Sequence, residues 1–502
     1  MPRVEVNLEL NRVEGDLTIG VTLEDGVVVD AKTVGHLYRG FEQILIGRTP
    51  RDAMVITPRI CGICSTVHLY AAVLALEQAW QLPVPANAVR IRDLCLMAEG
   101  IQSDLRQTFL FFAPDFCNPR YREHVLFDDV MAAFEPFKGA MHREALAITR
   151  RAVELIAHFG GQWPHSSYML PGGVASPPDM RRILACQAVL DEVSRWYETR
   201  VIGASLEQWL ALNSAPSLYG WLDQEGPANS ALGLMSRFMR SIGLHQLGAG
   251  TPHMISFAGI DPLLRASTGA GFYDADIKQV LPLDQGRINE HVRYSWFRQY
   301  AGGRHPYEGE TVPLYQPASD RYTWAKAPRY ADKVVQTGPL AELFIGGDAL
   351  IRSLHESEGD SAWLRQLARI RRTAFKLVRA RQLLKEMAAH LNEPHFLSPP
   401  AHAEKDGQGC GLIMAPRGAL GHWVKIRNGV IDKYQIITPT AWNASPRDSA
   451  GEMGHWERSL IGLRVADPDD PVEVGHVIRS HDPCLVCSVH FLGSGRRVRY
   501  AA

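Results

Sequence analysis

Apolar and polar residues alternate near the N-terminus with the two-residue period of a half-buried strand. The apolar members of this pattern are Leu17, Ile19, Val21 and Leu23. The dipeptide Asp25-Gly26 follows, and it can supply the φ > 0 positions of a tight hairpin turn. The pattern therefore predicts strands within residues 4–33.

The middle of the chain changes to the three- and four-residue spacing of helices. Ser65 and Thr66 are suitable caps for the first of them. Helices are predicted from Tyr70 to Trp80 and over about 88–113, 139–158, 179–212 and 361–391. Six arginines share the last helix. We interpret them as a solvated face, with a docking face for a partner as the alternative.

Strands are predicted again over residues 411–439, with Asn428-Gly429 as a hairpin turn. Residues 300–345 are rich in Gly, Pro and aromatic residues and are interpreted as a long ordered loop region. No internal repeat or domain boundary is evident. We therefore predict an α+β fold, predominantly α-helical, in which a long central helix bundle carries small peripheral sheets from both ends of the chain. Residues 1–490 would form a single domain.

The composition is that of an ordinary globular protein. The 502 residues are 46% hydrophobic and 21% charged, and the net charge is −1, which does not favour nucleic acid or an anionic membrane as a partner. The N-terminus lacks the apolar run of a secretory signal, and no stretch reaches the roughly 20 apolar residues of a membrane helix. We expect a cytoplasmic location, with any membrane association running through partners. A partner subunit could also carry an export signal for both.

Two Cys-x-x-Cys pairs stand at opposite ends of the chain. They are Cys61 with Cys64 and Cys484 with Cys487, and a histidine follows each pair. Four thiolates are soft donors that suit zinc, Cu(I), an Fe–S cluster or a nickel–iron centre. A structural zinc usually joins local segments, whereas these pairs lie 420 positions apart. The other four cysteines are isolated and are expected to be buried structural residues.

The two cysteine pairs resemble the motifs of the large subunit of nickel–iron hydrogenases. The stretch Arg59–His68 matches Arg-x-Cys-Gly-x-Cys-x-x-x-His, and Asp482–His490 matches Asp-Pro-Cys-x-x-Cys-x-x-His. Further matching segments include Arg12-Val13-Glu14-Gly15, Arg39-Gly40-Phe41-Glu42, Lys326-Ala327-Pro328-Arg329-Tyr330, Ala415-Pro416-Arg417-Gly418-Ala419 and Pro439-Thr440-Ala441-Trp442-Asn443. The resemblance therefore covers essentially the whole chain, from residue 11 to residue 490.

The resemblance implies a catalytic subunit that reversibly splits H2 into protons and electrons. Cys61 and Cys484 would bind nickel terminally, while Cys64 and Cys487 would bridge nickel and iron. The iron would also carry CO and two cyanides. The base would be the Cys484 thiolate or Arg417. Since an arginine is almost always protonated, Arg417 more safely orients and polarises H2.

The same resemblance assigns roles around the metals. Glu14 would be the first proton-relay carboxylate, followed here by Asp16 where many relatives have histidine. Asp482 and Asp104 would pair with Arg417. Thr440 and the backbone near Pro416 would form hydrogen bonds to the cyanides, and His68 would form one to a bridging sulfur. Glu42, His490 and the Ile436 carbonyl would hold Mg2+.

Two further stretches, Asn11–Asp16 and Gly161–Met169, resemble the cytoplasmic uptake and H2-sensing branch of the family. The expected role is H2 uptake, and the alternative is a sensor that signals to a kinase. Ile63 and Phe111 stand where other branches often carry smaller residues in the gas channel. Narrowing that channel should hinder O2 more than H2, so we expect some oxygen tolerance.

The resemblance also implies partners. No cysteine cluster remains for Fe–S centres, so electrons would leave through a small subunit that carries the Fe–S clusters. Metal-insertion proteins and a maturation endopeptidase would bind transiently. The tail 491–502 would either be removed after His490 or stay, and sensory members of the family often lack a removable tail. A structural zinc protein is the remote alternative.

Overall fold

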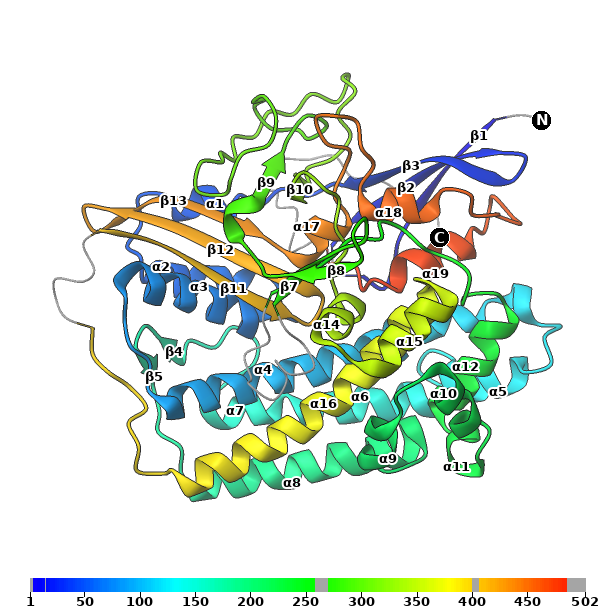
Figure 1. Cartoon of the computed structure of the whole chain (residues 1–502), viewed down its shortest axis with the longest axis horizontal. Helices are drawn as coiled ribbons and strands as arrows, with labels where there is room; N and C mark the ends of the chain where they lie inside the picture. Colours follow the sequence, from blue (N-terminus) through cyan, green and yellow to red (C-terminus); the bar gives the residue numbers. More distant parts are fainter. Residues whose placement is uncertain (1–2, 14, 258–269, 400–405, 485–502) are drawn as a thin grey trace.

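The computed structural model describes residues 3–13, 15–257, 270–399 and 406–484. Strands β1 (Val4–Glu9), β2 (Leu17–Glu24) and β3 (Val27–Gly35) form an antiparallel sheet in that order. Asp25 and Gly26 both have positive φ, so the predicted hairpin turn is confirmed. The apolar face of this sheet packs on α18 (His455–Leu460) and α19 (Val472–Arg479), close to the described C-terminal end (Figure 1).

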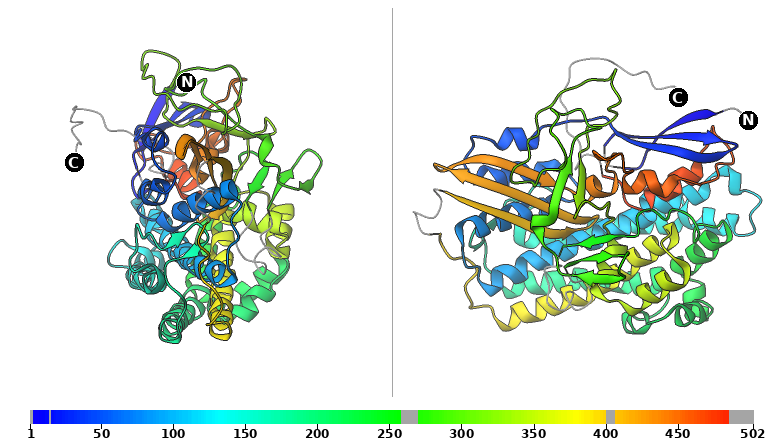
Figure 2. Two further views of the ribbon diagram at one scale, coloured as in Figure 1. Left: turned by 90° about the vertical axis from the view of Figure 1, so that its left-hand side faces the viewer. Right: turned by 45° about the horizontal axis from the view of Figure 1, so that its top comes forward.

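A second antiparallel sheet consists of β11 (Gly407–Ala415), β12 (Gly418–Arg427) and β13 (Val430–Ile437). Its second turn is the predicted Asn428-Gly429. Helix α3 (Ser65–Trp80) lies directly on β11 (Figure 2). A Cβ added to Gly411 would meet the carbonyl oxygen of Ala71 at 1.9 Å, and one added to Gly409 would meet that of Ala75 at 2.2 Å. The glycines of β11 therefore permit this close approach of helix and sheet.

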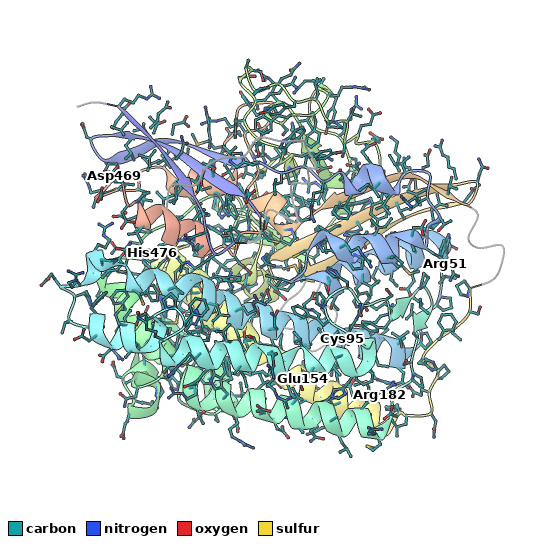
Figure 3. The ribbon with its side chains drawn as sticks, turned by 180° about the vertical axis from the view of Figure 1, so that it is seen from behind. Arg51, Cys95, Glu154, Arg182, Asp469 and His476 are labelled. Atoms are coloured by element: carbon teal, nitrogen blue, oxygen red, sulfur yellow. The ribbon has the colours of Figure 1, made fainter. Side chains whose placement is uncertain are left out.

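Long helices form the remaining layer, as Figure 3 shows from behind. Its members are α4 (Ala86–Arg106), α6 (Ala140–Ala152), α7 (Glu154–Gly160), α8 (Met180–Trp196) and α16 (Ala362–Ala389). The predicted helix over 361–391 is confirmed. The other long predictions are interrupted. Helices α4 and α8 each pass into a π-helical turn, at Gln107–Phe112 and Tyr197–Ile202, and the helix predicted over 139–158 is divided at Val153 into α6 and α7.

Shorter elements complete the described chain. The helices are α1 (Phe41–Leu45), α2 (Asp52–Ile56), α5 (Phe127–Phe134), α9 (Leu206–Ala211), α10 (Ala215–Leu222), α11 (Glu225–Ala228), α12 (Ala231–Ser241), α14 (Pro339–Gly346), α15 (Ala349–Glu358) and α17 (Pro439–Asn443). The strands are β4 (Met169–Leu170), β5 (Gly173–Val174), β6 (Met254–Ser256), β7 (Gly271–Asp274), β8 (Gln279–Leu281), β9 (Ile288–His291) and β10 (Ala327–Tyr330). Among the described residues, no helix is both long and apolar enough to cross a membrane.

The arginines of α16 are not the predicted solvated face. Five of the six are buried, namely Arg365, Arg369, Arg371, Arg372 and Arg379. Carboxylates of other segments reach them, for example Asp348 at Arg371 and Asp360 at Arg365, at 2.7 Å in each case. The prediction was wrong because it assumed that charges on a helix face water, whereas these charges find partners inside the protein. Burial also excludes the alternative of a docking face.

Candidate metal centre

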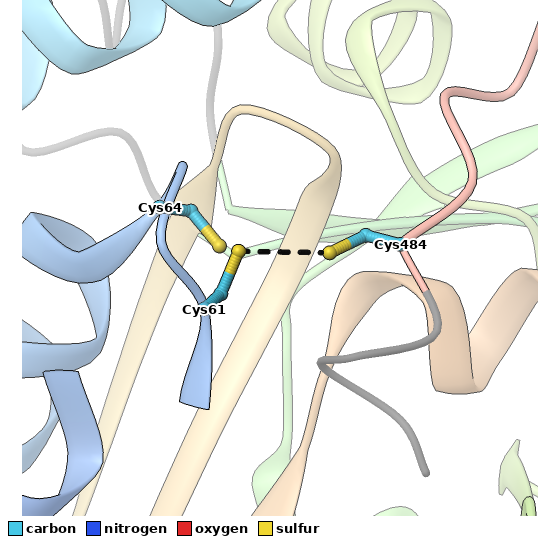
Figure 4. Close-up of side chains that lie close together, drawn as sticks. All are labelled: Cys61, Cys64 and Cys484. Atoms are coloured by element: carbon cyan, nitrogen blue, oxygen red, sulfur yellow. Dashed lines mark hydrogen bonds between the residues drawn. The ribbon is translucent and has the colours of Figure 1, made fainter. Parts of the chain in front are cut away.

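Three cysteines from the two ends of the chain meet at one point (Figure 4). The turn Cys61–Cys64 immediately precedes α3, and Cys484 follows α19. Their Sγ atoms lie within 4.8 Å of one another, and those of Cys61 and Cys484 are 3.7 Å apart. All three side chains are buried. Such a set of converging thiolates fits a soft metal ion. Cys487, Glu14 and His490 lie outside the described residues.

Contacts beyond the cysteines hold the chain ends together. Arg479 of α19 donates to the backbone oxygen of Asn11 at 3.2 Å and to its side-chain oxygen at 2.8 Å. It also donates to Asp115 at 2.6 Å, and Arg12 bonds the other oxygen of the same carboxylate. Asp115 thus links the first strands of the chain to the helix that precedes Cys484.

The first cysteine pair is fixed by a glutamate of another helix. Glu99 of α4 accepts hydrogen bonds from the backbone N–H groups of Thr66, at 2.8 Å, and Val67, at 3.0 Å. The indole of Trp163 donates to it at 3.2 Å. Burial raises the pKa of Glu99 to about 7, although these hydrogen bonds lower it. Glu99 therefore caps the N-terminus of α3, a role that the sequence assigned to Ser65 and Thr66. No local pattern predicts this role for a glutamate in the middle of another helix.

Arg417 faces the thiolates from the turn between β11 and β12. Its Nη2 lies 3.2 Å from Asp482 Oδ1, and its Nε donates to the Asp482 carbonyl at 3.2 Å. Its Nη1 is buried and has no hydrogen-bond partner among the described residues. Burial lowers the pKa of Arg417, but Asp482 and the cysteines outweigh burial and hold it well above its ordinary value. The site therefore contains a permanent cation with one unused donor group.

Asp104 does not pair with Arg417, and that part of the prediction was wrong. Its carboxylate bonds Arg372, with one contact at 3.1 Å, and Lys376 at 3.0 Å. Both cations lie on α16, one turn apart, on the face of that helix that packs against α4. Asp104 is also buried rather than solvated. Sequence reasoning missed Arg372 and Lys376 because it placed the charges of α16 in solvent.

His68 belongs to a buried chain of rings. Its Nδ1 lies 3.1 Å from Nε2 of His422, and Nδ1 of His422 lies 2.9 Å from the hydroxyl of Tyr434. Burial lowers the pKa of His68 to about 4, although the negative charge of Cys61 raises it. The ring is therefore neutral near pH 7. His422 and Tyr434 were not predicted, since a histidine and a tyrosine in strands read as ordinary core residues.

The remaining predicted neighbours lie around the cysteines. The Thr440 hydroxyl accepts the backbone N–H of Cys484 at 3.2 Å, which leaves its own proton available to a second group. The backbone N–H of Ile63 points to Cys61 Sγ at 3.4 Å, and the Ile63 side chain is buried. Phe111 is half-buried in the π-helical turn after α4. Pro416 directs its carbonyl to Arg372.

The predicted magnesium ligands are brought together in part. Glu42 accepts the backbone N–H of Ile436 at 3.0 Å, and both residues line a small cavity of about 30 Å³. The Lys326 ammonium reaches this cavity and lies 3.6 Å from Glu42 and 3.3 Å from Glu290. Burial raises the pKa of Glu290 to about 7. Glu42 and the Ile436 carbonyl are donors of the kind that magnesium prefers. Lys326 already brings a positive charge to Glu42 and Glu290, so the magnesium site stays a prediction.

A second group of candidate ligands does not form a metal site. His253, Asp274 and Asp276 approach one another near β7. The ammonium of Lys333 lies between the carboxylates, at 2.7 Å from Asp274 and 2.6 Å from Asp276. This lysine already supplies the positive charge that a cation would bring, so the group is an ion-pair cluster.

Buried thiolates from both chain ends, opposed by an arginine, define a metalloprotein with a soft-metal centre. A family model described as nickel-dependent hydrogenase matches residues 39–126 and 248–490. The large subunit of the periplasmic [NiFeSe] hydrogenase of Desulfomicrobium baculatum is 33% identical over 531 residues, covering 98% of this chain and 95% of that protein. The uptake hydrogenase large subunit of Rhodobacter capsulatus is 27% identical over 597 residues, covering 97% and 94%.

Solved structures agree with these sequence relatives. The Ni-Fe-Se hydrogenase of D. vulgaris Hildenborough in the reduced state superposes with a TM-score of 0.82 at 30% identity, over 97% of this chain and 100% of that one. The chain belongs to the nickel-dependent hydrogenase family and is a catalytic large subunit of that enzyme class. The predicted α+β fold is confirmed. The suggested cytoplasmic uptake and sensing branch finds no support, since one of these relatives is named as periplasmic.

Proposed function

We propose that this chain catalyses the reversible heterolytic cleavage of H2, working physiologically in H2 uptake. The observation that carries the proposal is the meeting of three buried thiolates opposite the unused Nη1 of Arg417. Cys61 and Cys484 would hold nickel terminally, and Cys64 and Cys487 would bridge it to an iron with CO and two cyanides. When bound, such a centre supplies Lewis-acidic metals beside which H2 is polarised.

The residues of the chain then divide the work. The Arg417 guanidinium keeps its proton, so it orients and polarises H2 rather than removing a proton. The Cys484 thiolate is left as the base, and Glu14 would take the proton from it towards the surface. Thr440 can donate its hydroxyl proton to a cyanide because its oxygen already accepts from Cys484. Glu42, Ile436 and His490 would hold magnesium near the C-terminal end.

Electrons leave through a partner in this proposal. The isolated cysteines Cys95, Cys117, Cys186 and Cys410 form no cluster with one another, since the one group of three or more cysteines among the described residues is the site itself. An Fe–S small subunit is therefore the expected partner, and relatives named as large subunits or large chains support this. Activity of the large subunit alone at the rate of the complex would contradict it.

Uptake is favoured over sensing by the relative named as an uptake hydrogenase. The two roles separate by turnover with an artificial dye and by whether a kinase co-purifies. Slow turnover with a bound kinase would identify a sensor.

The cytoplasmic location is likewise proposed, and fractionation of cells tests it. Processing of the tail 491–502 is tested by intact mass, since a nickel-loaded chain that ends at His490 has been cleaved.

Metal analysis and infrared spectroscopy of the purified complex test the proposed centre. We expect one nickel and one iron in the large subunit, together with CO and CN stretching bands. A Cys61→Ser variant should lose nickel and the activity, whereas Cys186→Ser, in the helix layer, should keep both. Zinc alone in the wild-type protein would overturn the proposal.

A further inference from the structure

A buried arginine of α16 reaches the turn that carries Arg417. Pro416 and Arg417 form the two-residue loop between β11 and β12, since Ala415 pairs with Gly418. Nη2 of Arg372 donates to the carbonyl oxygen of Pro416. Asp482 holds the Arg417 side chain at the next residue. The loop is therefore anchored at both of its residues, by groups from segments far away in the sequence.

The guanidinium of Arg372 is itself fixed on all sides. Its Nε donates to Asp104 at 3.1 Å, its Nη1 to Glu342 at 2.6 Å, and its Nη2 to both Asp104 and Pro416. Asp104 comes from α4, Glu342 from α14 and Arg372 from α16, so three helices meet at this point. All three side chains are buried. The guanidinium makes these four contacts from three nitrogens of one plane, and the single nitrogen of a lysine cannot reproduce that arrangement.

Electrostatics keep the cluster charged. Burial raises the pKa of Asp104, but Arg372 and Lys376 outweigh burial and hold it below its usual range. Burial likewise lowers the pKa of Arg372, and Asp104 and Glu342 raise it above its ordinary value. Each of these two groups therefore stabilises the charged form of the other, and the pair holds the guanidinium in place.

We propose that Arg372 is a positioning residue of the reaction, which aims Arg417 at the metal centre by holding the Pro416 carbonyl. This rests on the proposed function, because it concerns how the same site is aligned. Asp104 and Glu342 act one step further away, by fixing the guanidinium of Arg372. Arg372 lies on α16, whose arginines the sequence pattern indicated to be a solvated face.

Arg371 offers a matched control on the same helix. It is buried like Arg372 but lies about 100° around the helix. It bonds Asp348 at 2.7 Å, the Trp209 carbonyl at 2.8 Å and the Leu212 carbonyl at 2.9 Å. Arg371→Lys makes the same chemical change as Arg372→Lys, because each keeps a buried positive charge and loses the planar guanidinium. It leaves the contact with Pro416 in place, so the two substitutions separate stability from alignment.

The test compares Arg372→Lys with Arg371→Lys in the purified complex with its small subunit. We expect Arg372→Lys to keep nickel and iron, to lose about 10²-fold in kcat with dye as acceptor, and to shift the CO and CN bands. Arg371→Lys should lower the Tm by a similar amount and leave kcat and the bands close to wild type. Equal kcat values and unshifted bands in both variants would overturn the positioning role.

A second variant covers the case in which Arg372→Lys does not fold. Glu342→Gln keeps an acceptor for Nη1 of Arg372 but removes one charge of the cluster. It should shift the CO and CN bands by less than Arg372→Lys and in the same direction, and unshifted bands would also overturn the role. Wild-type protein without nickel, or without H2 turnover, would instead refute the proposed function, so the two failures are distinguishable.

Discussion

At the scale of single residues, Arg417 owes its role to its neighbours. An arginine after a proline in a loop is ordinarily a surface residue. Here it is buried, one side of its guanidinium is held by Asp482, and Nη1 is left without a partner among the described residues. A buried cation with an unused donor is costly unless something occupies the space before it. The unused donor is therefore available to the substrate in the proposed reaction.

Replacing Arg417 by lysine should reduce kcat by about 10²–10³-fold, because an ammonium keeps the charge but lacks the planar fork in which Nε and Nη2 contact Asp482 and Nη1 stays unused. Nickel and iron contents should stay at wild-type values, since no metal ligand is changed. Dye-linked H2 oxidation and metal analysis check this. A variant with full activity would show that charge alone suffices and that the fork geometry is irrelevant.

The size of Ile63 and Phe111 should govern access of O2. Ile63 is buried beside Cys61, and Phe111 is half-buried in the π-helical turn, with Arg106 over its ring at 5.6 Å. The double substitution Ile63→Val and Phe111→Leu widens the path, so we expect faster inactivation by O2 with little change in the KM for H2. Activity decay in air-equilibrated buffer measures this, and an unchanged decay rate would refute the channel argument.

At the scale of elements, helix α3 is aligned by a partner helix. Its first N–H groups have no acceptor within the helix, and Glu99 of α4 provides one for Thr66 and Val67. A carboxylate at the N-terminus of a helix also interacts favourably with the helix dipole. Because the cysteine pair directly precedes this turn, the cap fixes the metal ligands as well as the helix.

Glu99→Gln should therefore destabilise the protein by about 1–3 kcal/mol, since a carboxamide turns one of its acceptors into a donor that faces another N–H. We expect faster hydrogen exchange at Thr66 and Val67 and a lower nickel content. Glu77→Gln, in the last turns of α3, is the control, because Glu77 bonds Arg92 away from the cysteines. Unchanged exchange at the start of α3 would contradict the capping role.

At the scale of the whole molecule, distant parts of the chain are joined by buried polar groups. Glu457 of α18 accepts the backbone N–H of Thr33 in β3 at 3.1 Å and the hydroxyl of Tyr322 at 2.7 Å. Its second oxygen is buried without a partner among the described residues. Burial raises the pKa of Glu457 to about 7, which favours the protonated form when the protein is folded.

A raised carboxyl pKa makes stability fall as pH rises. The stabilisation is complete below the unfolded value, near 4.3, and is lost as pH passes the folded value of about 7. Relative to Glu457→Gln, the wild-type protein should therefore lose up to about 3 kcal/mol between pH 5 and pH 8. Unfolding of the complex followed across this range checks the prediction, and a difference that does not vary with pH would contradict it.

Local features of this protein were determined by the sequence itself. The turns Asp25-Gly26 and Asn428-Gly429, helix α16 and the two cysteine pairs depend on residues a few positions apart, so their patterns are visible in the chain. Partnerships between distant segments were decided only by the tertiary structure. Asp104 bonds Arg372 across 268 positions rather than Arg417, and Glu99 caps a helix 33 positions away. Arg371 and Arg372 of α16 are buried because Asp348, Asp104 and Glu342 from other parts of the chain pair with them, and no local pattern encodes these partners.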